Sequence, residues 1–382
     1  MSLRFLTAGE SHGQALVGIL EGLPAGLALT AEDLQRDLLR RKKGHGRGRR
    51  QKIEGDAVEI LAGVRRGKTL GSPLALLVPN LDFKNWRGIM GAEPTDAPSQ
   101  RRVEVPRPGH ADLVGRLKYG FDDMRDVLER ASARETAMRV ALGGAARRLL
   151  EECGVVVASR VVAIGGVEDP APAPVPVAEL DALTDRDPVR CASPEASARM
   201  VARVDEAKAA GDTLGGVFEV LVEGLPAGLG SYAHWDRRLE GPLSAALMSL
   251  NAVKGVEVGL GFAAARLPGS GAHDAYEPRG RKVAYRSNRS GGLDGGMTTG
   301  QTLVLRAAMK PLATLMKPLD SVDLRTMKPA KAHVERSDAC AVPAAAVIGE
   351  SLAALVLAGA VLDKFGGDSM GELLPRVRAW RR

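Results

Sequence analysis

The residues best suited to acid–base chemistry come early in the chain, in the segment Gly9–Gly13, which reads GESHG. This segment fits G-x-S-x-G, the serine nucleophile motif of α/β-hydrolases, which requires a strand, a sharp turn and then a helix. Here a strand-like run follows the motif, and His12 is adjacent to Ser11 and so poorly placed to act as its base. A serine hydrolase therefore stays an alternative function. The flanking glycines instead favour close approach of the imidazole to a ligand.

A second histidine and an aspartate lie in two other segments that could take part in proton transfer. His110 follows Arg107 in the sequence RPGHAD, where proline and glycine predict a tight loop. Because a guanidinium is a natural clamp for an anion, His110 is a candidate proton donor to a leaving phosphate. Asp338 follows Arg336 and precedes an apolar helix. It fits either a structural carboxylate or an oriented acid–base group.

Basic residues are concentrated in residues 40–50, and the net charge of the whole chain is +7. A positive field favours anionic partners, which leaves a nucleic-acid-binding protein as a second alternative function. The basic run lacks interleaved aromatic residues for base stacking. A glycine-rich basic loop can equally close over a small polyanion or stay solvated. The segment Glu129–Glu135 predicts a helix start whose free backbone N–H groups favour phosphate, unless it is an ordinary capped helix.

Regular elements must position these residues, and the sequence predicts several of them. Periodicity favours helices at 31–41 and roughly 236–250, and a capping box at Ser132 and Glu135 predicts a helix that ends before Gly154. Ser193 predicts the start of another helix, which reaches about residue 210. The run VVVASRVVAIGG predicts a strand. Expected loops are 168–192, 40–52, 84–102 and 268–300.

Two helices are apolar on more than one face, near 135–152 and 343–363. A helix of this kind is covered on both sides, so we predict a helical layer between two sheets. The apolar segment 341–362 carries Pro343 and Glu350. We therefore interpret it as a buried core helix and not as a membrane span.

The sequence EGLPAGL occurs twice, at Glu21–Leu27 and at Glu223–Leu229, each time after a strand-like run. Identity over this length is improbable by chance. We predict one domain over 1–382 with related halves at about 1–165 and 212–365, and with 166–211 as a connecting loop and helix. The alternative is one common turn used twice.

The cysteines Cys153, Cys191 and Cys340 form no CxxC pair and, with histidine, no cluster with zinc spacing. They indicate reduced thiols in a cytosolic protein without a metal site. The start of the chain lacks the long apolar run of a signal peptide. Neither a Rossmann nor a P-loop fingerprint is present, which argues against a nucleotide site of either kind.

Four segments resemble motifs of the chorismate synthase family: GESHGQALVGILEGLP, RPGHADLVGRLKYG, ERASARETAMRVA and RSDACAVPAA. They are collinear and extend from residue 9 to beyond residue 345. The resemblance implies a lyase of the shikimate pathway that converts 5-enolpyruvylshikimate 3-phosphate to chorismate by 1,4-elimination of phosphate. It also implies an α/β (α+β) fold of the β-α-β sandwich type with antiparallel sheets, and a cytoplasmic homotetramer with no nucleic-acid or membrane partner.

The resemblance further implies a requirement for reduced FMN. Some family members reduce their flavin with NADPH and others rely on a separate flavin reductase. The absence of a Rossmann fingerprint or an added domain favours the second arrangement here.

The family also implies roles for individual residues. The histidine matching His12 is expected to protonate the reduced N1 side of the flavin, and His110 to protonate the departing phosphate. Asp338 is expected near flavin N5, which takes the substrate proton with transient electron donation from the flavin. Ser11 and Ser132 are expected as relay groups.

Binding residues follow from the same resemblance. Arg107, Arg134 and Arg336 are expected to neutralise carboxylates and phosphate, and Arg41 and Arg47 match the basic loop that binds substrate or NADP. The expected flavin contacts are Arg130, Ala131, Ser132, Asn251, Ala252, Gly295, Lys310, Pro311, Leu312, Ala313, Thr314 and Arg336. The family pattern has small hydroxyl residues where this chain has Leu312 and Ala313, so only backbone contacts are expected there.

Overall fold

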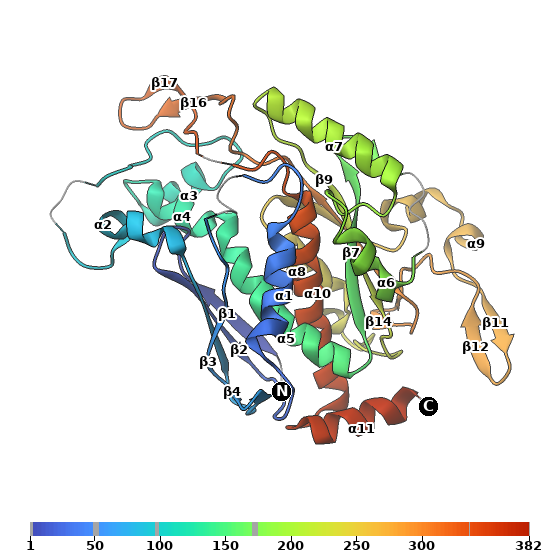
Figure 1. The fold of residues 1–382 in the computed structure, drawn as a ribbon. Coiled ribbons are helices and arrows are strands. Elements are labelled where there is room, and N and C mark those ends of the chain that lie inside the picture. Colours follow the sequence, from blue (N-terminus) through green and yellow to red (C-terminus); the bar gives the residue numbers. More distant parts are fainter. Residues whose placement is uncertain (1–2, 49–52, 96–98, 170–174, 336, 382) are drawn as a thin grey trace.

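A computed structural model describes residues 3–48, 53–95, 99–169, 175–335 and 337–381 of the chain. Two antiparallel sheets and the helices between them form its main body (Figure 1). The mixed helix and strand content with antiparallel pairing confirms the expected α/β class. Arg336, which we expected at the site, lies outside the described residues.

The first sheet has the strand order β1-β2-β6-β3, with every pair antiparallel. In β2, Leu16, Gly18 and Leu20 are buried while their neighbours are not, which is the alternation of a strand with one face on the core. The strands are β1 Arg4–Ala8, β2 Ala15–Glu21, β3 Glu59–Ala62 and β6 Leu74–Pro79, and the short β4 Val64–Arg65 and β5 Lys68–Thr69 form a hairpin beside them.

The second sheet has the strand order β10-β15-β9-β7-β8 and is again antiparallel throughout. Residues 218–222 of its central strand β9 are all buried. The strands are β7 Val156–Ile164, β8 Val167–Glu168, β9 Gly216–Glu223, β10 Val253–Val258 and β15 Leu303–Met309.

Long helices occupy the space between the sheets (Figure 1). Helix α5, Thr136–Glu152, packs against β2 and β6 of the first sheet, and α10, Val342–Phe365, packs against β7 and β9 of the second. The two helices contact each other closely, because a Cβ on Gly143 would lie 2.7 Å from the Ser351 backbone. Helices α1, Ala31–Lys42, and α8, Glu240–Met248, also contact α10.

Helix α10 is long and apolar enough to cross a membrane by length and composition alone, but 89% of its most apolar window is buried inside the protein. This burial confirms the prediction of a core helix for residues 341–362.

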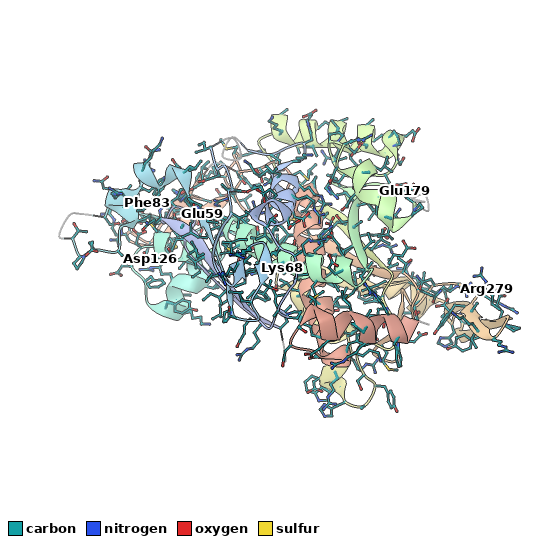
Figure 2. The ribbon with its side chains drawn as sticks, turned by 60° about the horizontal axis from the view of Figure 1, so that its bottom comes forward. Glu59, Lys68, Phe83, Asp126, Glu179 and Arg279 are labelled. Carbon is teal, nitrogen blue, oxygen red and sulfur yellow. The ribbon has the colours of Figure 1, made fainter. Side chains whose placement is uncertain are left out.

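The remaining short helices, turns and hairpins lie around this main body. The β11–β12 hairpin projects from it, and Figure 2 shows Arg279 at the far end. The helices are α2 Arg87–Met90, α3 Asp112–Tyr119, α4 Arg125–Ala131, α6 Val177–Thr184, α7 Pro194–Ala209, α9 Gly269–Ala272, α11 Met370–Arg381 and the 3₁₀ turns η2 Leu81–Asn85, η3 Ala133–Glu135, η4 Trp235–Arg237 and η5 Gly261–Arg266. The strands are β11 Tyr276–Arg279, β12 Lys282–Tyr285, β13 Leu293–Asp294, β14 Met297–Thr298, β16 Asp320–Asp323 and β17 Lys328–Lys331.

Several sequence expectations need correction. Residues 168–192 include helix α6, which the proline- and alanine-rich composition hid, and 268–300 includes two hairpins and not only loop. Ser132 does not cap the long helix: its side chain accepts from the N–H of Arg134 and starts the short turn η3, and α5 begins only at Thr136. The helix expected at 236–250 is shorter, because η4 and a break precede α8.

The two EGLPAGL copies make the same hydrogen bonds. After β2, the Thr69 hydroxyl donates to Pro24 O at 2.6 Å and accepts from the N–H of Leu27 at 2.9 Å. After β9, the Thr298 hydroxyl donates to Pro226 O at 2.7 Å and accepts from the N–H of Leu229 at 2.8 Å. Each copy therefore closes its turn on a threonine from a later strand.

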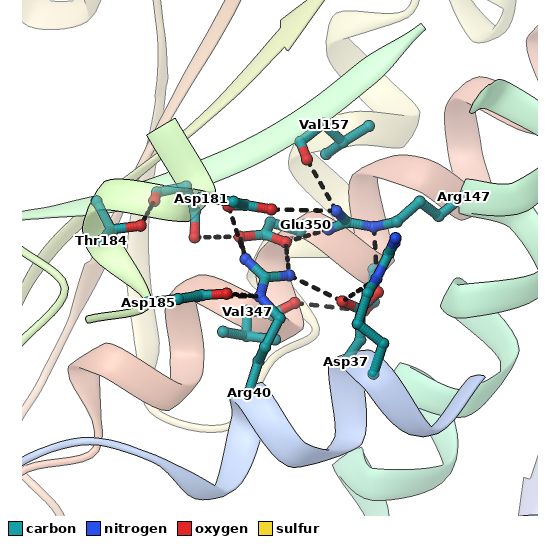
Figure 3. A network of polar contacts seen from close by, with 12 residues as sticks. Asp37, Arg40, Arg147, Val157, Asp181, Thr184, Asp185, Val347 and Glu350 are labelled. Atoms are coloured by element: carbon teal, nitrogen blue, oxygen red, sulfur yellow. Dashed lines mark hydrogen bonds and ion pairs between the residues drawn. The ribbon is translucent and has the colours of Figure 1, made fainter. Parts of the chain in front are cut away.

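A cluster of charged side chains lies where α1, α5 and α10 meet, mostly buried but with two half-buried aspartates, Asp181 and Asp185, and we call it the core charge cluster (Figure 3). Arg40 is its centre, at 2.6 Å from Glu350, 2.7 Å from Asp181 and 2.8 Å from Asp37 and from Asp185. Burial would raise the pKa of Glu350, but the attraction of three arginines outweighs it and holds the pKa well below its usual range. The members are Asp37, Arg40, Arg147, Asp181, Asp185, Arg190 and Glu350.

Candidate active site

A cavity with a volume of about 380 Å³ brings together most of the residues that the sequence singled out. Its size falls within the range of small-molecule sites. The expected residues that line it are Ser11, His12, Arg41, Arg47, Arg107, His110, Ala131, Ser132, Arg134, Asn251, Ala252, Lys310, Leu312, Ala313, Thr314 and Asp338.

Three expected residues lie outside this lining. Arg130 turns away from the cavity and donates to the backbone oxygens of Gly9, at 3.0 Å, and Thr7, at 2.8 Å. Gly295 lies in the turn between β13 and β14, and Pro311 is next to lining residues without being one of them. Arg130 therefore supports the segment that carries His12 and does not itself face the cavity.

The segment before β2 places Ser11 and His12 at the cavity. Gly9 has φ of 105°, and a Cβ there would lie 2.3 Å from Ala15 O, so only glycine permits this turn. A Cβ on Gly13 would lie 2.8 Å from a carboxylate oxygen of Glu10. Gly9 is thus required by the turn itself, whereas at Gly13 the clash would be with a flexible side chain; that the glycines allow the imidazole to approach a ligand stays a prediction.

His12 is held on two sides. Its Nδ1 lies 2.9 Å from Oε1 of Glu129, a fully buried carboxylate on α4, and its ring stacks on Trp86 with the centroids 3.9 Å apart. Ser11 has a different partner, because its hydroxyl donates to that of Ser132 at 3.0 Å. The segment continues into β2 and not into a helix, so the hydrolase interpretation lacks the strand–turn–helix that it needs.

His110 and Arg107 share one buried carboxylate, Asp112, at the start of α3. Arg107 donates to Asp112 from Nε, at 2.8 Å, and from Nη2, at 2.9 Å, and Nδ1 of His110 lies 2.6 Å from the same carboxylate. Burial would raise the pKa of Asp112, but the hydrogen bonds from His110 and Arg107 hold that pKa well below its usual range. The arrangement fixes a guanidinium and an imidazole side by side at the cavity wall.

Arg41 and Arg134 form a cationic wall that has few anions of its own. Arg41 donates to Thr136 and to Ala133 O, both at 2.9 Å, and its nearest carboxylate, that of Asp56, is 3.5 Å away. Arg134 is paired closely with the same Asp56. Burial, and after it the guanidiniums of Arg47 and Arg134, lower the pKa of Arg41 to about 10, although Asp56 opposes them.

Asp338 is held by the basic loop. One carboxylate oxygen lies 2.7 Å from Arg47 Nη1, and the other accepts from the N–H of Gly48 at 2.6 Å. The expected acid–base group and the expected substrate arginine therefore meet directly, which the sequence analysis did not foresee.

Apolar side chains also line the cavity, together with polar atoms. Leu128, Leu250, Met309 and Ile348 are among them. Asn251 donates to Ala131 O at 3.1 Å, and its Oδ1 is buried with no hydrogen-bond partner among the residues described. Ala252 has φ of 68°, a left-handed conformation that is uncommon outside glycine and concentrates at functional sites.

Sequence reasoning missed the carboxylates that hold the expected residues. Glu129 and Asp112 lie within quoted motifs, one residue from the expected Arg130 and two residues from the expected His110, but we assigned them no role. Asp56 and Asn80 lie outside every motif. Asn80 accepts from Arg134 Nε at 2.9 Å and donates to Gly13 O at 2.7 Å, so it links the cationic wall to the segment of His12.

Comparisons with known proteins agree on one family. The family model described as chorismate synthase matches residues 3–362. The chain is 54% identical to a chorismate synthase of Geobacillus kaustophilus (strain HTA426), over 100% of this chain and 99% of that protein. It is also 54% identical to one of Thermobifida fusca (strain YX), over 99% and 98%. A solved chorismate synthase structure matches with a TM-score of 0.79 at 39% identity, covering 100% of this chain and 97% of that one.

Proposed function

The chain belongs to the chorismate synthase family, and on that basis we propose that the cavity described above is where it converts 5-enolpyruvylshikimate 3-phosphate to chorismate and phosphate. The chain is thus a lyase, and the family does not support the two alternatives, a nucleic-acid-binding protein or a serine hydrolase. The observation that carries the proposal is that His12, His110 and Asp338, far apart in sequence, line one cavity together with four arginines.

Substrate binding falls to the arginines. The substrate carries two carboxylates and a phosphate, which demand concentrated positive charge and forked hydrogen bonds. Arg41 has only the distant carboxylate of Asp56, at 3.5 Å, and thus retains attraction for an incoming anion, whereas Arg134 pairs with Asp56 and lies 3.6 Å from Glu54. We assign Arg41, Arg47, Arg107 and Arg134 to the substrate's anionic groups.

Proton delivery to the leaving phosphate falls to His110. Its Nδ1 is held by Asp112 at 2.6 Å beside the Arg107 guanidinium, so one group can neutralise the phosphate while the other protonates it. A positioned general acid typically contributes about 10²–10⁴-fold in rate.

Reduced FMN is the cofactor we propose, and the cavity suits it. The apolar side chains in its lining fit a flat ring, and the buried, unpartnered Oδ1 of Asn251 can accept from a ring N–H. Reduced flavin supplies transient electron donation that no side chain can provide. The residues that would hold it are Ala131, Ser132, Asn251, Ala252, Lys310, Leu312, Ala313 and Thr314. The Leu312 carbonyl already accepts from the Thr213 hydroxyl at 2.8 Å. Leu312 would therefore contact the flavin mainly through its apolar side chain.

His12, Asp338, Ser11 and Ser132 complete the proton-transfer groups. Ser11 and Ser132 are hydrogen bonded to each other at 3.0 Å, which is the geometry of a short relay. Asp338 is oriented by Arg47 and Gly48.

We also propose the remaining family features for this chain. These are a cytoplasmic homotetramer, the β-α-β sandwich with two related halves, and flavin reduction by a separate reductase, with NADPH as the alternative electron source. The helices between the two sheets and the matched threonine contacts of the EGLPAGL copies support the second of them.

An anaerobic assay with photoreduced FMN tests the function. The folded protein should release phosphate from the substrate, and no turnover under these conditions would end the proposal. The variant His110→Ala should lose about 10²–10⁴-fold in rate while FMN binding, followed by the flavin spectrum, is retained. His234→Ala is the matched control, because this exposed histidine lies outside the cavity and should keep the full rate. Wild-type rates for His110→Ala would contradict the proton-donor role.

A further inference from the structure

Glu129 holds the segment of His12 from both the side chain and the backbone. Its Oε2 accepts from the His12 backbone N–H at 2.7 Å, its Oε1 lies 2.9 Å from the ring Nδ1, and its own carbonyl accepts from the N–H of Ser11 at 2.9 Å. Glu129 is 1% exposed and does not line the cavity, whereas His12 does. The Nδ1 edge of the ring therefore faces the protein interior.

Hydrogen-bond donors other than the His12 ring also contact the Glu129 carboxylate. Arg125 donates to Oε1 at 3.2 Å and pairs at 2.8 Å with a second carboxylate, that of Glu335. Because donors approach both carboxylate oxygens, Glu129 acts as an acceptor toward the ring, and Nδ1 must carry the hydrogen of the shared bond.

Stacking on Trp86 also restricts rotation of the His12 ring. Trp86 stacks on the imidazole with an interplanar angle of 21°, and the Arg101 guanidinium lies 4.2 Å from the Trp86 ring centroid. A stacked ring with one fixed edge has no easy alternative orientation. Its free edge is the one that carries Nε2.

We propose that Glu129 is a positioning residue of the reaction, which takes the Nδ1–H of His12 and so makes Nε2 the atom that exchanges a proton with the cavity. The catalytic role of Glu129 rests on the proposed function, whereas its contacts with His12 do not depend on that function. A carboxylate that fixes the tautomer of an acid–base histidine is a recurrent arrangement in enzymes.

The same chain repeats the arrangement at its second histidine, where Asp112 lies 2.6 Å from Nδ1 of His110. Glu129 and Asp112 come from different helices, α4 and α3, and differ in length by one methylene. Both sites therefore place a buried carboxylate at Nδ1, although Nη2 of Arg107 also lies 3.0 Å from Nδ1 of His110 and 3.4 Å from its Nε2.

Nitrogen-15 spectroscopy of histidine-labelled, sedimented protein tests the proposal without substrate or flavin. Among the six histidines, the His12 signals are assigned by their loss in His12→Gln. In the wild type, Nδ1 should show the chemical shift of a protonated nitrogen, and in the neutral ring Nε2 should show that of an unprotonated one. A wild-type His12 with its single proton on Nε2 would overturn the proposal, whatever the variants do.

Variants separate positioning from a structural role. Glu129→Gln offers one acceptor oxygen in place of two and adds a donor, so the Nε2–H tautomer should appear and kcat should fall about 10–100-fold with KM nearly unchanged. Glu129→Asp retains the carboxylate and should keep more of the Nδ1–H tautomer and of kcat than Glu129→Gln. Glu335→Gln removes the other partner of Arg125 and should leave the His12 tautomer as in the wild type.

Two outcomes contradict the proposal. One is an unchanged Nδ1–H tautomer and unchanged kcat in Glu129→Gln. The other is an equal loss of that tautomer in Glu335→Gln, which would assign the effect to Arg125. Because the tautomer is read on the free protein, failure of the proposed function would appear as absent turnover and would leave this measurement intact.

Discussion

Arg40 and Arg41 are neighbours on helix α1, yet they enter opposite electrostatic environments. Arg40 lies in the core charge cluster within 2.8 Å of four carboxylates, and their attraction raises its pKa well above the usual value despite burial. Arg41 lies at the cavity, where the nearest carboxylate is 3.5 Å away and burial with two neighbouring guanidiniums lowers its pKa to about 10. About 100° of helix rotation thus separates a cation with four close carboxylates from one with no carboxylate nearer than 3.5 Å.

The contrast shows that arginine density does not by itself identify a binding site. The core charge cluster contains three arginines and four carboxylates, so its cations are already neutralised and it has a structural role. In the cavity, by contrast, Arg41 has no close carboxylate, so a polyanionic substrate can supply the missing negative charge. Each prediction below tests one side of this difference.

The largest effect should come from removing the central carboxylate of the core charge cluster. Glu350→Ala would leave Arg40, Arg147 and Arg190 without their shared partner in a buried site. Breaking a buried ion pair in this way costs about 3–5 kcal/mol, measured as the free energy of unfolding in urea. Arg4→Ala is the control, because its pair with Glu21 is exposed and should contribute under about 1 kcal/mol. Equal losses in the two variants would show that the cluster is not a structural centre.

An intermediate effect is expected at the cavity, and it should fall on binding. Arg41→Met removes a buried cation that has no carboxylate closer than 3.5 Å, so its cost in free energy of unfolding should be clearly smaller than that of Glu350→Ala. Substrate affinity should fall by about 1.5–3 kcal/mol, roughly 10- to 100-fold, as expected for hydrogen bonds to a charged group. Steady-state kinetics and urea unfolding on the same preparation measure both quantities. A destabilisation as large as that of Glu350→Ala would erase the distinction between the two arginines.

The smallest effect should be a pH dependence within the core charge cluster. Burial, and after it the repulsion of Glu350, raise the pKa of Asp181 from 3.8 to about 6. The folded state then binds more protons than the unfolded chain between those values, so this group lowers stability as the pH rises through the window. Asp181→Asn removes that contribution, and its cost in unfolding free energy should shrink from pH 4 to pH 6.5. A cost that grows with pH would mean that attraction to the arginines dominates.

Local signals in the sequence account for much of what could be predicted. His12, His110 and Ser132 lie in motifs several residues long that carry the resemblance to the family, which placed them at one site, and all three line the cavity. The long helices α7 and α10 could be predicted because capping residues and apolar length leave few alternatives. Helix α6 was missed, since eight residues without a side-chain cap carry little signal.

Other features depend on distant contacts that no local pattern records. Arg130 is adjacent to Ala131, which lines the cavity, yet about 100° of helix rotation per residue directs it to Thr7 and Gly9. The partnership of Arg41 with Asp56, and of His12 with Glu129, depends on how separate elements meet. A single sequence contains the side chains but not their pairing.

Glu350 also has a consequence for the newly made chain, before any partner is in place. Helix α10 is long and apolar enough to be mistaken by insertion machinery for a bilayer anchor. A carboxylate well inside such a segment opposes its transfer into lipid by on the order of 3 kcal/mol. The residue that gathers three arginines therefore also disfavours lipid as an alternative environment for this helix, relative to its place between the two sheets.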